Sequence, residues 1–154
     1  MPVLERIAIQ DFRNIVFQEL SFSPNVNCVS GNNGVGKTNL MDAIWYLSMT
    51  KSAFSTPDRF NWRYGTEGFT IGGTYAMEGA PDSVFSIRVA DGEKRLTRDG
   101  KAIGRMSEHI GTVPVVMVSP GDISLVGEGG EERRRLADGL RGLRLWRAVA
   151  DDTG

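Results

Sequence analysis

Hydrophobic and polar positions change their spacing along the chain, and each change predicts a different element. Residues 4–11 and 17–22 carry apolar side chains at the intervals of half-buried strands. Residues 39–48 instead repeat apolar side chains at helical spacing, which predicts a helix with one core-facing stripe. That stripe is expected to consist of Leu40, Met41, Ile44 and Leu47.

The middle of the chain has the sequence pattern of an antiparallel sheet. Residues 69–75, 84–89 and 94–98 look like antiparallel strands, and the first two are rich in β-branched and aromatic side chains. Asp91-Gly92 and Asp99-Gly100 follow the second and third of these segments, and Asp-Gly pairs favour tight hairpin turns. We therefore predict consecutive hairpins here.

The remaining segments are more varied. No clear period runs through residues 50–64, and residues 106–110 predict one helical turn in which His109 is a surface or capping residue. The continuous apolar run at 113–118 is typical of a parallel strand buried on both faces. A charged helix is expected over residues 131–143.

One sequence motif predicts a binding site. The pattern Gly, four residues, Gly, Lys, Ser/Thr defines a phosphate-binding P-loop. A predicted short buried strand ending at residues 27–30 precedes it and the predicted helix follows, which is the setting that the motif requires. Its candidate nucleotide-binding residues are Gly31, Asn32, Asn33, Gly34, Val35, Gly36, Lys37 and Thr38.

The residue types explain how this loop would bind phosphate. Its glycines allow backbone angles that turn successive N–H groups toward phosphate oxygens, and the helix adds its positive N-terminal end. Lys37 would reach the β and γ phosphates, while the Thr38 hydroxyl would coordinate Mg²⁺. The alternative, a glycine-rich turn with a solvated Lys37, leaves the ordered Gly-Lys-Thr unexplained.

Composition narrows the class of protein. The 154 residues suffice for one domain, and 40% hydrophobic with 24% charged residues is ordinary for a globular protein. No apolar run reaches membrane-spanning length and no signal-peptide pattern opens the chain, so a cytoplasmic protein without membrane contact is expected. The single Cys28 is expected to pack in the strand before the loop rather than to react.

Charge does not point to nucleic acid, because the formal net charge is −1. Arginines crowd the end of the chain, and acidic residues partly offset them, which favours a solvated helix face. The arginines are Arg133, Arg134, Arg135, Arg141, Arg144 and Arg147, and the acidic residues are Glu128, Glu131 and Glu132.

Four segments, in order, resemble the RecF family of bacterial DNA replication and repair proteins, of the SMC-like ABC ATPase class. They are residues 10–14 (Gln-Asp-Phe-Arg-Asn), 36–44 (Gly-Lys-Thr-Asn-Leu-Met-Asp-Ala-Ile), 115–123 and 131–135. The resemblance implies an α/β fold: a P-loop NTPase core, ABC/SMC-head-like, with an inserted antiparallel β subdomain at about 66–105. Residues 1–140 would form the N-terminal lobe, with the helical lobe missing.

The resemblance also implies ligands and partners. ATP and Mg²⁺ would be the cofactors, and Arg13 corresponds to an arginine that approaches the nucleotide, although a surface arginine is the simpler interpretation of the residue itself. Asp122 is a candidate for the outer coordination sphere of the Mg²⁺, or equally a helix N-cap, and Gly121 departs from the family's usual acidic residue. The family's partners are DNA, single-stranded or gapped duplex, recombination mediator proteins and an ATP-dependent second copy, in replication, recombinational repair and the SOS response.

The sequence departs from the family after residue 140. Neither the ABC signature nor an acidic Walker B strand is found, and residues 141–154 look atypical, so we expect a fragment, with a frameshift near residue 141 as one explanation. Hydrolysis needs those parts. The chain is therefore expected to bind Mg·ATP weakly and to hydrolyse it little, and no catalytic residue is assigned.

Three alternatives remain open. The chain could be a head fragment of another SMC-like ATPase, although no heptad run for a coiled coil occurs between residues 50 and 110. It could be a small P-loop kinase, which the two-turn β segment fits poorly. It could also fail to fold, because a missing lobe would expose an apolar face and a sheet edge.

Overall fold

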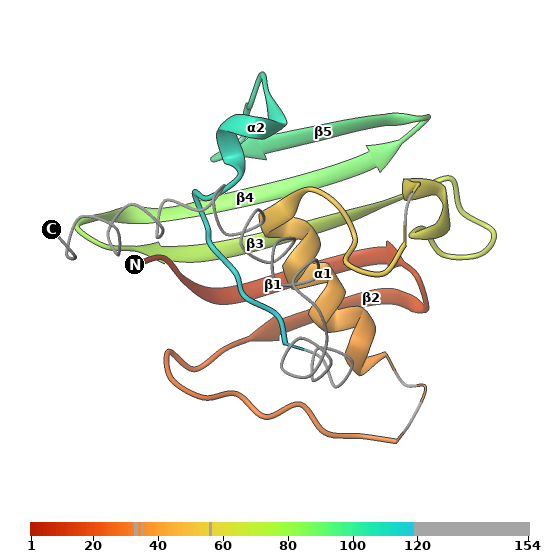
Figure 1. Ribbon diagram of the computed structural model, residues 1–154, viewed down its shortest axis with the longest axis horizontal. Helices are drawn as coiled ribbons and strands as arrows, with labels where there is room; N and C mark the ends of the chain where they lie inside the picture. The colour runs from red at the N-terminus through yellow and green to blue at the C-terminus, as the bar shows by residue number, and fades with distance from the viewer. Residues whose placement is uncertain (33, 35, 56, 119–154) are drawn as a thin grey trace, which may run out of the picture.

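The computed structural model describes residues 1–32, 34, 36–55 and 57–118. Six strands form one antiparallel sheet in the order β2-β1-β3-β4-β5-β6, and the long helix α1 lies across one of its faces (Figure 1). The elements are β1 (Val3–Phe12), β2 (Ile15–Ser21), α1 (Lys37–Met49), η1 (Asp58–Phe60), β3 (Gly68–Met77), β4 (Ala80–Ala90), β5 (Glu93–Arg98), β6 (Lys101–Ala102) and α2 (Met106–His109).

The strands and hairpins predicted within residues 4–22 and 69–98 are present, and they form one sheet. β1 pairs directly with β3, with Ile9 opposite Ile71, so the N-terminal hairpin and the later strands share one sheet. Asp91 and Gly92 have φ of 54° and 74°, as a type I′ hairpin turn requires. In the described residues the fold is a mainly antiparallel sheet with two short-to-medium helices, and no parallel pair occurs there.

The core lies between the sheet and α1. Alternate residues of β3 and β4 are buried, as the period of a strand dictates, and they face the helix. Phe12, Tyr46 and Phe69 join β1, α1 and β3 in edge-to-face contacts with ring centroids 5.0 to 6.1 Å apart. The buried apolar residues of α1 are Leu40, Ala43, Tyr46 and Leu47.

The predicted apolar stripe of α1 is therefore partly wrong. Met41 is 47% exposed, whereas Ala43 and Tyr46 are fully buried. The helix is turned so that its aromatic Tyr46 reaches the ring cluster, and Met41 faces outward. Sequence hydropathy ranks Met above Tyr, but packing with Phe12 and Phe69 determines which side faces the sheet.

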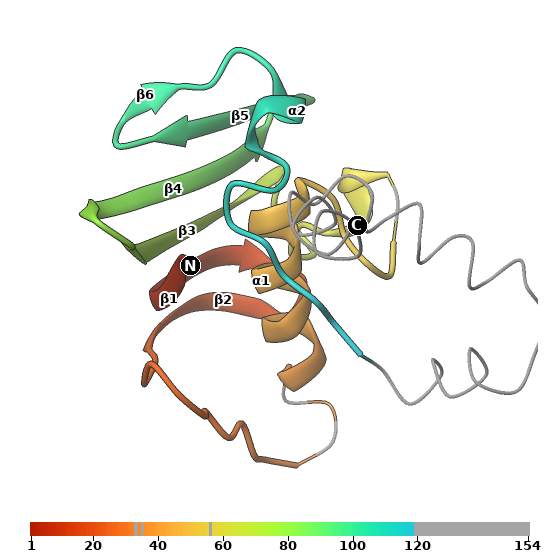
Figure 2. The same ribbon diagram turned by 60° about the vertical axis from the view of Figure 1, so that its left-hand side comes forward.

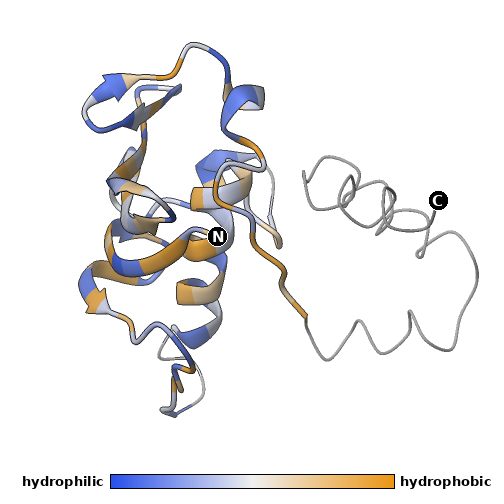
Figure 3. Cartoon of the chain, turned by 90° about the vertical axis from the view of Figure 1, so that its left-hand side faces the viewer, coloured by the Kyte–Doolittle hydropathy of each residue, from blue (hydrophilic) through white to orange (hydrophobic). Residues whose placement is uncertain are grey.

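Two predicted buried strands do not form. Residues 27–30 are not a strand and Cys28 is exposed, which corrects its expected packing role. Residues 113–118 are likewise extended without strand pairing, and Val116 and Val118 are 72% and 82% exposed. This segment runs beside α1 on the same side of the sheet (Figure 2), and Figure 3 shows a run of hydrophobic residues along it. A strand requires a hydrogen-bonded neighbour, and neither segment has one among the described residues.

His109 is a core residue, not the surface or capping residue expected from the sequence. Its side chain is 1% exposed and stacks at 5.1 Å on Phe85. Nε2 lies 2.7 Å from the Leu47 carbonyl, which can only accept, so Nε2 carries the proton. This bond ties the end of α2 to α1. The predicted helix at 131–143 lies outside the described residues.

Candidate phosphate-binding site

The glycine-rich loop before α1 has the backbone conformation that its sequence predicts. Gly34 and Gly36 have φ of 86° and 105°, in the left-handed region that glycine favours. A side chain at Gly36 would also be crowded, because an added Cβ would lie 3.0 Å from the Asn14 Oδ1 atom. Asn33 and Val35 lie outside the described residues.

Lys37, the first residue of α1, folds back over the loop. Its Nζ donates to the carbonyls of Gly31 and Asn32, at 2.6 and 2.7 Å. Among the described residues no carboxylate pairs with this ammonium. Its positive charge is therefore held at the mouth of the loop and is not neutralised by a neighbouring acid.

The N-terminus of α1 completes an anion-binding arrangement. The first turn contains no acidic residue, and Gly36 supplies no side-chain cap, so the helix's first N–H groups have no competing side chain. A pocket of about 250 Å³ opens here and is lined by Gly34, Gly36, Lys37, Thr38 and Asn39. Thr38 is exposed, so its hydroxyl is accessible to a metal ion held by a phosphate.

Asn14, which the sequence argument did not single out, touches the loop directly. Its Nδ2 donates to the Gly34 carbonyl at 3.2 Å, and its Oδ1 accepts from Asn39 Nδ2 at 2.7 Å. Asn14 lies in the turn between β1 and β2, which the fold brings beside the start of α1. The only sequence signal for it is its place in the Phe-Arg-Asn segment at residues 12–14.

Arg13 is held within the protein. Its Nη2 lies 2.7 Å from Asp42 Oδ2, and Asp42 is fully buried in α1. The same nitrogen donates to Ser52 at 2.9 Å and Ser55 at 3.1 Å. These contacts connect the β1–β2 turn to the helix and to the loop after it. They supply a structural role for Arg13, and its predicted approach to a nucleotide stays a prediction.

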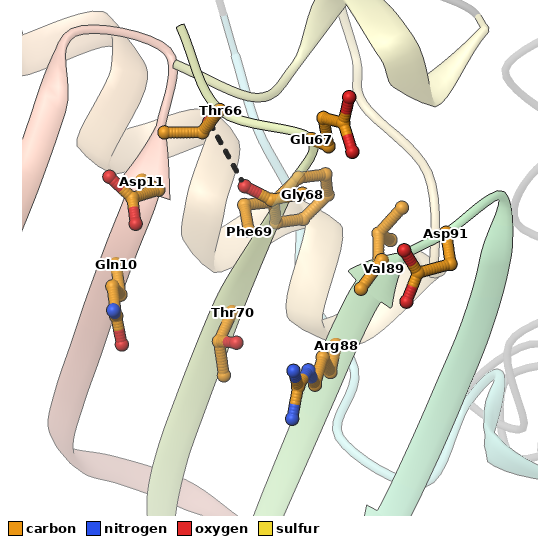
Figure 4. Close-up of a pocket in the computed structure, with 11 residues that line it drawn as sticks. Gln10, Asp11, Thr66, Glu67, Gly68, Phe69, Thr70, Arg88, Val89 and Asp91 are labelled. Atoms are coloured by element: carbon orange, nitrogen blue, oxygen red, sulfur yellow. Dashed lines mark hydrogen bonds between the residues drawn. The ribbon is translucent and has the colours of Figure 1, made fainter.

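A larger depression of about 440 Å³ lies elsewhere, on the sheet face away from α1 (Figure 4). Gln10, Thr70 and Arg88 line it from neighbouring strands, with Asp11 and Asp91 at its end. Asp11 is already paired with Arg63 at 2.8 Å. The depression carries charges of both signs and no helix N-terminus, so it lacks the features of a phosphate cradle.

The remaining candidate, Asp122, lies outside the described residues, as does the segment around it. Within the described part of the chain, no group of three or more His, Cys, Asp or Glu side chains is placed to hold a metal ion. Among the described residues, Thr38 is the candidate ligand at this loop for a Mg²⁺ held by phosphates. No helix in the described residues is long and apolar enough to cross a membrane.

Comparison with known proteins identifies the family. The model of the RecF/RecN/SMC N-terminal domain matches residues 3–58, which include the loop and α1. The DNA replication and repair proteins RecF of Bacteroides fragilis and Phocaeicola vulgatus are 43% and 44% identical over 137 residues, which cover 88% of this chain and 37% of each relative. The chain corresponds to the N-terminal portion of RecF.

Solved structures agree. The recombination mediator protein RecF-ATPrS of the RecFOR pathway matches with a TM-score of 0.84 at 28% identity, over 92% of this chain and 38% of that one. RecF-ATP of the same pathway matches with a TM-score of 0.79 at 29% identity, over 89% and 38%. The predicted RecF resemblance is confirmed. Because the chain spans little more than a third of these relatives, the activity of whole RecF is not thereby established for it.

Proposed function

We propose that this chain binds Mg·ATP through the loop at residues 31–38, as the nucleotide-binding portion of a RecF-type protein. The observation that carries the proposal is Lys37, an ammonium without a carboxylate partner in the described residues, held by loop carbonyls at a helix N-terminus free of acids. Lys37 and the loop N–H groups would hold the phosphates, and Thr38 would bind the Mg²⁺. Bound Mg²⁺ would neutralise phosphate charge.

The proposed partners are inferred from the similarity to RecF. The charges of this chain do not themselves point to them. We propose ATP-dependent contact with DNA, single-stranded or gapped duplex, and with recombination mediator proteins, through a dimer in the whole protein, in the cytoplasm. Nucleotide would act by favouring the closed dimer through differential affinity. Arg13 and Asp122 remain proposed nucleotide-site and outer Mg²⁺ residues. Hydrolysis is expected to be slow, because the acidic Walker B strand and the ABC signature on which it depends are not found in the sequence.

The test is a titration of the purified chain with a fluorescent ATP analogue and Mg²⁺, beside Lys37→Ala. A charged hydrogen-bonding group contributes about 1.5–3 kcal/mol, so Lys37→Ala should weaken binding by about 10- to 100-fold. Lys101→Ala, an exposed lysine in β6, is the matched control and should bind like the unchanged chain.

Removal of Mg²⁺ with a chelator should weaken binding further in the unchanged protein. Equal affinities of the Lys37→Ala and Lys101→Ala variants, both shown to be folded, would disprove a working loop. Brisk ATP hydrolysis that depends on Lys37 would instead contradict the expected slow turnover.

A further inference from the structure

The β1–β2 turn holds α1 at two points. Arg13 reaches Asp42 and Asn14 reaches Asn39, so two consecutive turn residues bind two helix residues three positions apart. Residues at that spacing lie on the same face of a helix. The turn is therefore fixed against one side of the helix's first two turns.

The position of Asn14 is set by contacts that do not involve the loop. Arg13, its neighbour, has a φ of 53°, and its backbone N–H donates to the Asn61 carbonyl at 2.8 Å. The buried Asp42 carboxylate holds the Arg13 side chain. Asn14 is thus carried on a rigid support, with its carboxamide directed at the phosphate loop.

The two ends of that carboxamide act on the loop differently. Nδ2 donates to the Gly34 carbonyl, which fixes the direction of that carbonyl group in the loop. Oδ1 binds Asn39, one turn into the helix, and lies against Gly36. The loop and the helix start are therefore held in one relative position.

We propose that Asn14 is a positioning residue, whose carboxamide sets the shape of the phosphate loop so that its N–H groups face the ligand. The proposal rests on the proposed function, because it concerns how the same loop binds phosphate. Asn14 needs no contact with the nucleotide itself. Its effect should therefore follow the phosphates and be independent of the base.

The experiment measures the affinity of Asn14→Ala for Mg·ATP analogue and for Mg·tripolyphosphate. Loss of two neutral hydrogen bonds should weaken both ligands by the same factor, about 5- to 10-fold. Asn25→Ala, an exposed asparagine in the segment after β2, is the matched control and should change neither affinity. A general loss of packing would lower the unfolding midpoint without this equal effect on the two ligands.

A second variant, Asn14→Asp, separates an effect on phosphate binding from an effect on packing. It keeps the acceptor for Asn39 but replaces the donor to Gly34 by a negative oxygen near the bound phosphates. Binding should be weaker than in Asn14→Ala at low salt, and the difference should shrink in high salt, where charges are screened. A role in packing alone predicts no such salt dependence.

The outcomes separate this proposal from the proposed function. Lys37-dependent binding in the unchanged chain, with Asn14→Ala and Asn14→Asp equal to Asn25→Ala, would overturn the role of Asn14 and leave nucleotide binding intact. Absence of binding in the unchanged chain would overturn both. If Asn14→Ala does not fold, Asn39→Ala removes the contact to Asn14 Oδ1 together with a side chain that lines the pocket, and its failure to weaken binding of either ligand would count against the proposal.

Discussion

Asp42 places a charge inside the molecule, and its neighbours explain why it is tolerated. The carboxylate accepts from Ser52 Oγ and from the Ala53 N–H, each at 2.8 Å, besides its contact with Arg13. A buried charge is costly unless it is paired and hydrogen-bonded. Asp42 meets both conditions, which makes its partners important for stability.

Replacing Arg13 by Ala should lower the free energy of unfolding by about 3 kcal/mol, because it leaves a buried carboxylate without its cation. Urea denaturation followed by circular dichroism measures this change. Arg95→Ala is the control, since its pair with Glu93 is exposed and such pairs contribute about 0–1 kcal/mol. A loss below about 1 kcal/mol in Arg13→Ala would show that the Arg13–Asp42 pair does not support the fold.

The buried His109 predicts that the stability of the fold depends on pH. Burial is the largest cause that lowers the pKa of His109 below 6.5; the nearby Arg98 lowers it further, and the bond to Leu47 opposes the shift. The unfolded chain then binds the proton more readily than the folded chain, so stability falls as pH drops below 6.5. The slope attributable to His109 is at most about 1.4 kcal/mol per pH unit.

The His109→Gln variant retains a donor for the Leu47 carbonyl but does not titrate. Its free energy of unfolding should therefore change less between pH 7 and 5 than that of the unchanged chain. The carboxyl groups are the same in both proteins, so their contributions largely cancel in the comparison. Parallel pH profiles for the two proteins would contradict the assignment to His109.

The elements whose conformation is determined by residues adjacent in the sequence were predicted correctly. The Asp91-Gly92 turn is encoded by two adjacent residues that accept positive φ, and it forms as predicted. The segments 27–30 and 113–118 have the apolar pattern of strands, but a strand also depends on a neighbour that its own pattern does not specify. Asn14 was missed for a related reason, since its contacts with Gly34 and Asn39 exist only once the sheet and helix have packed.

α1 packs tightly against β3 at Gly73. A Cβ added there would lie 2.4 Å from Leu47 Cδ2 and 3.2 Å from Leu4 Cδ1. Gly73→Ala should therefore destabilise the protein by about 1–3 kcal/mol, the usual cost of overpacking a core. The neighbouring Gly72 faces the other side of the sheet, where the nearest atom to an added Cβ is 3.8 Å away.

Gly72→Ala is thus a matched control on the same strand, and thermal unfolding of both variants tests the packing. A cost confined to Gly73→Ala is expected. Similar midpoints for the two variants would mean that α1 has room to move away from β3.

Over the whole molecule, the described residues form one sheet with α1 on one face, and the segment 113–118 runs beside that helix. The sequence predicted the α and β elements but not that β1 and β3 are neighbours, because pairing between distant strands leaves no local signature. Exposed valines remain near or within the segments 26–30 and 113–118: Val26, Val29, Val116 and Val118.

Such exposed apolar side chains favour association between molecules. Val116→Lys together with Val118→Lys should reduce concentration-dependent light scattering while changing the free energy of unfolding by no more than about 0.5 kcal/mol. Val113→Lys is the contrasting variant, because Val113 is 1% exposed and should be destabilised by the charge. Unchanged scattering in the double variant would assign association to another surface.

The pairing of β1 with β3 also has a consequence for the order of folding. The phosphate loop and α1 both lie in the sequence between these two strands, whose register places Val3 opposite Ala76. Closing such a long stretch costs chain entropy before its contacts form, which slows folding. During refolding, the ability to capture nucleotide should therefore arise together with the central strand pairing, and a ligand added early would find no preformed loop to select.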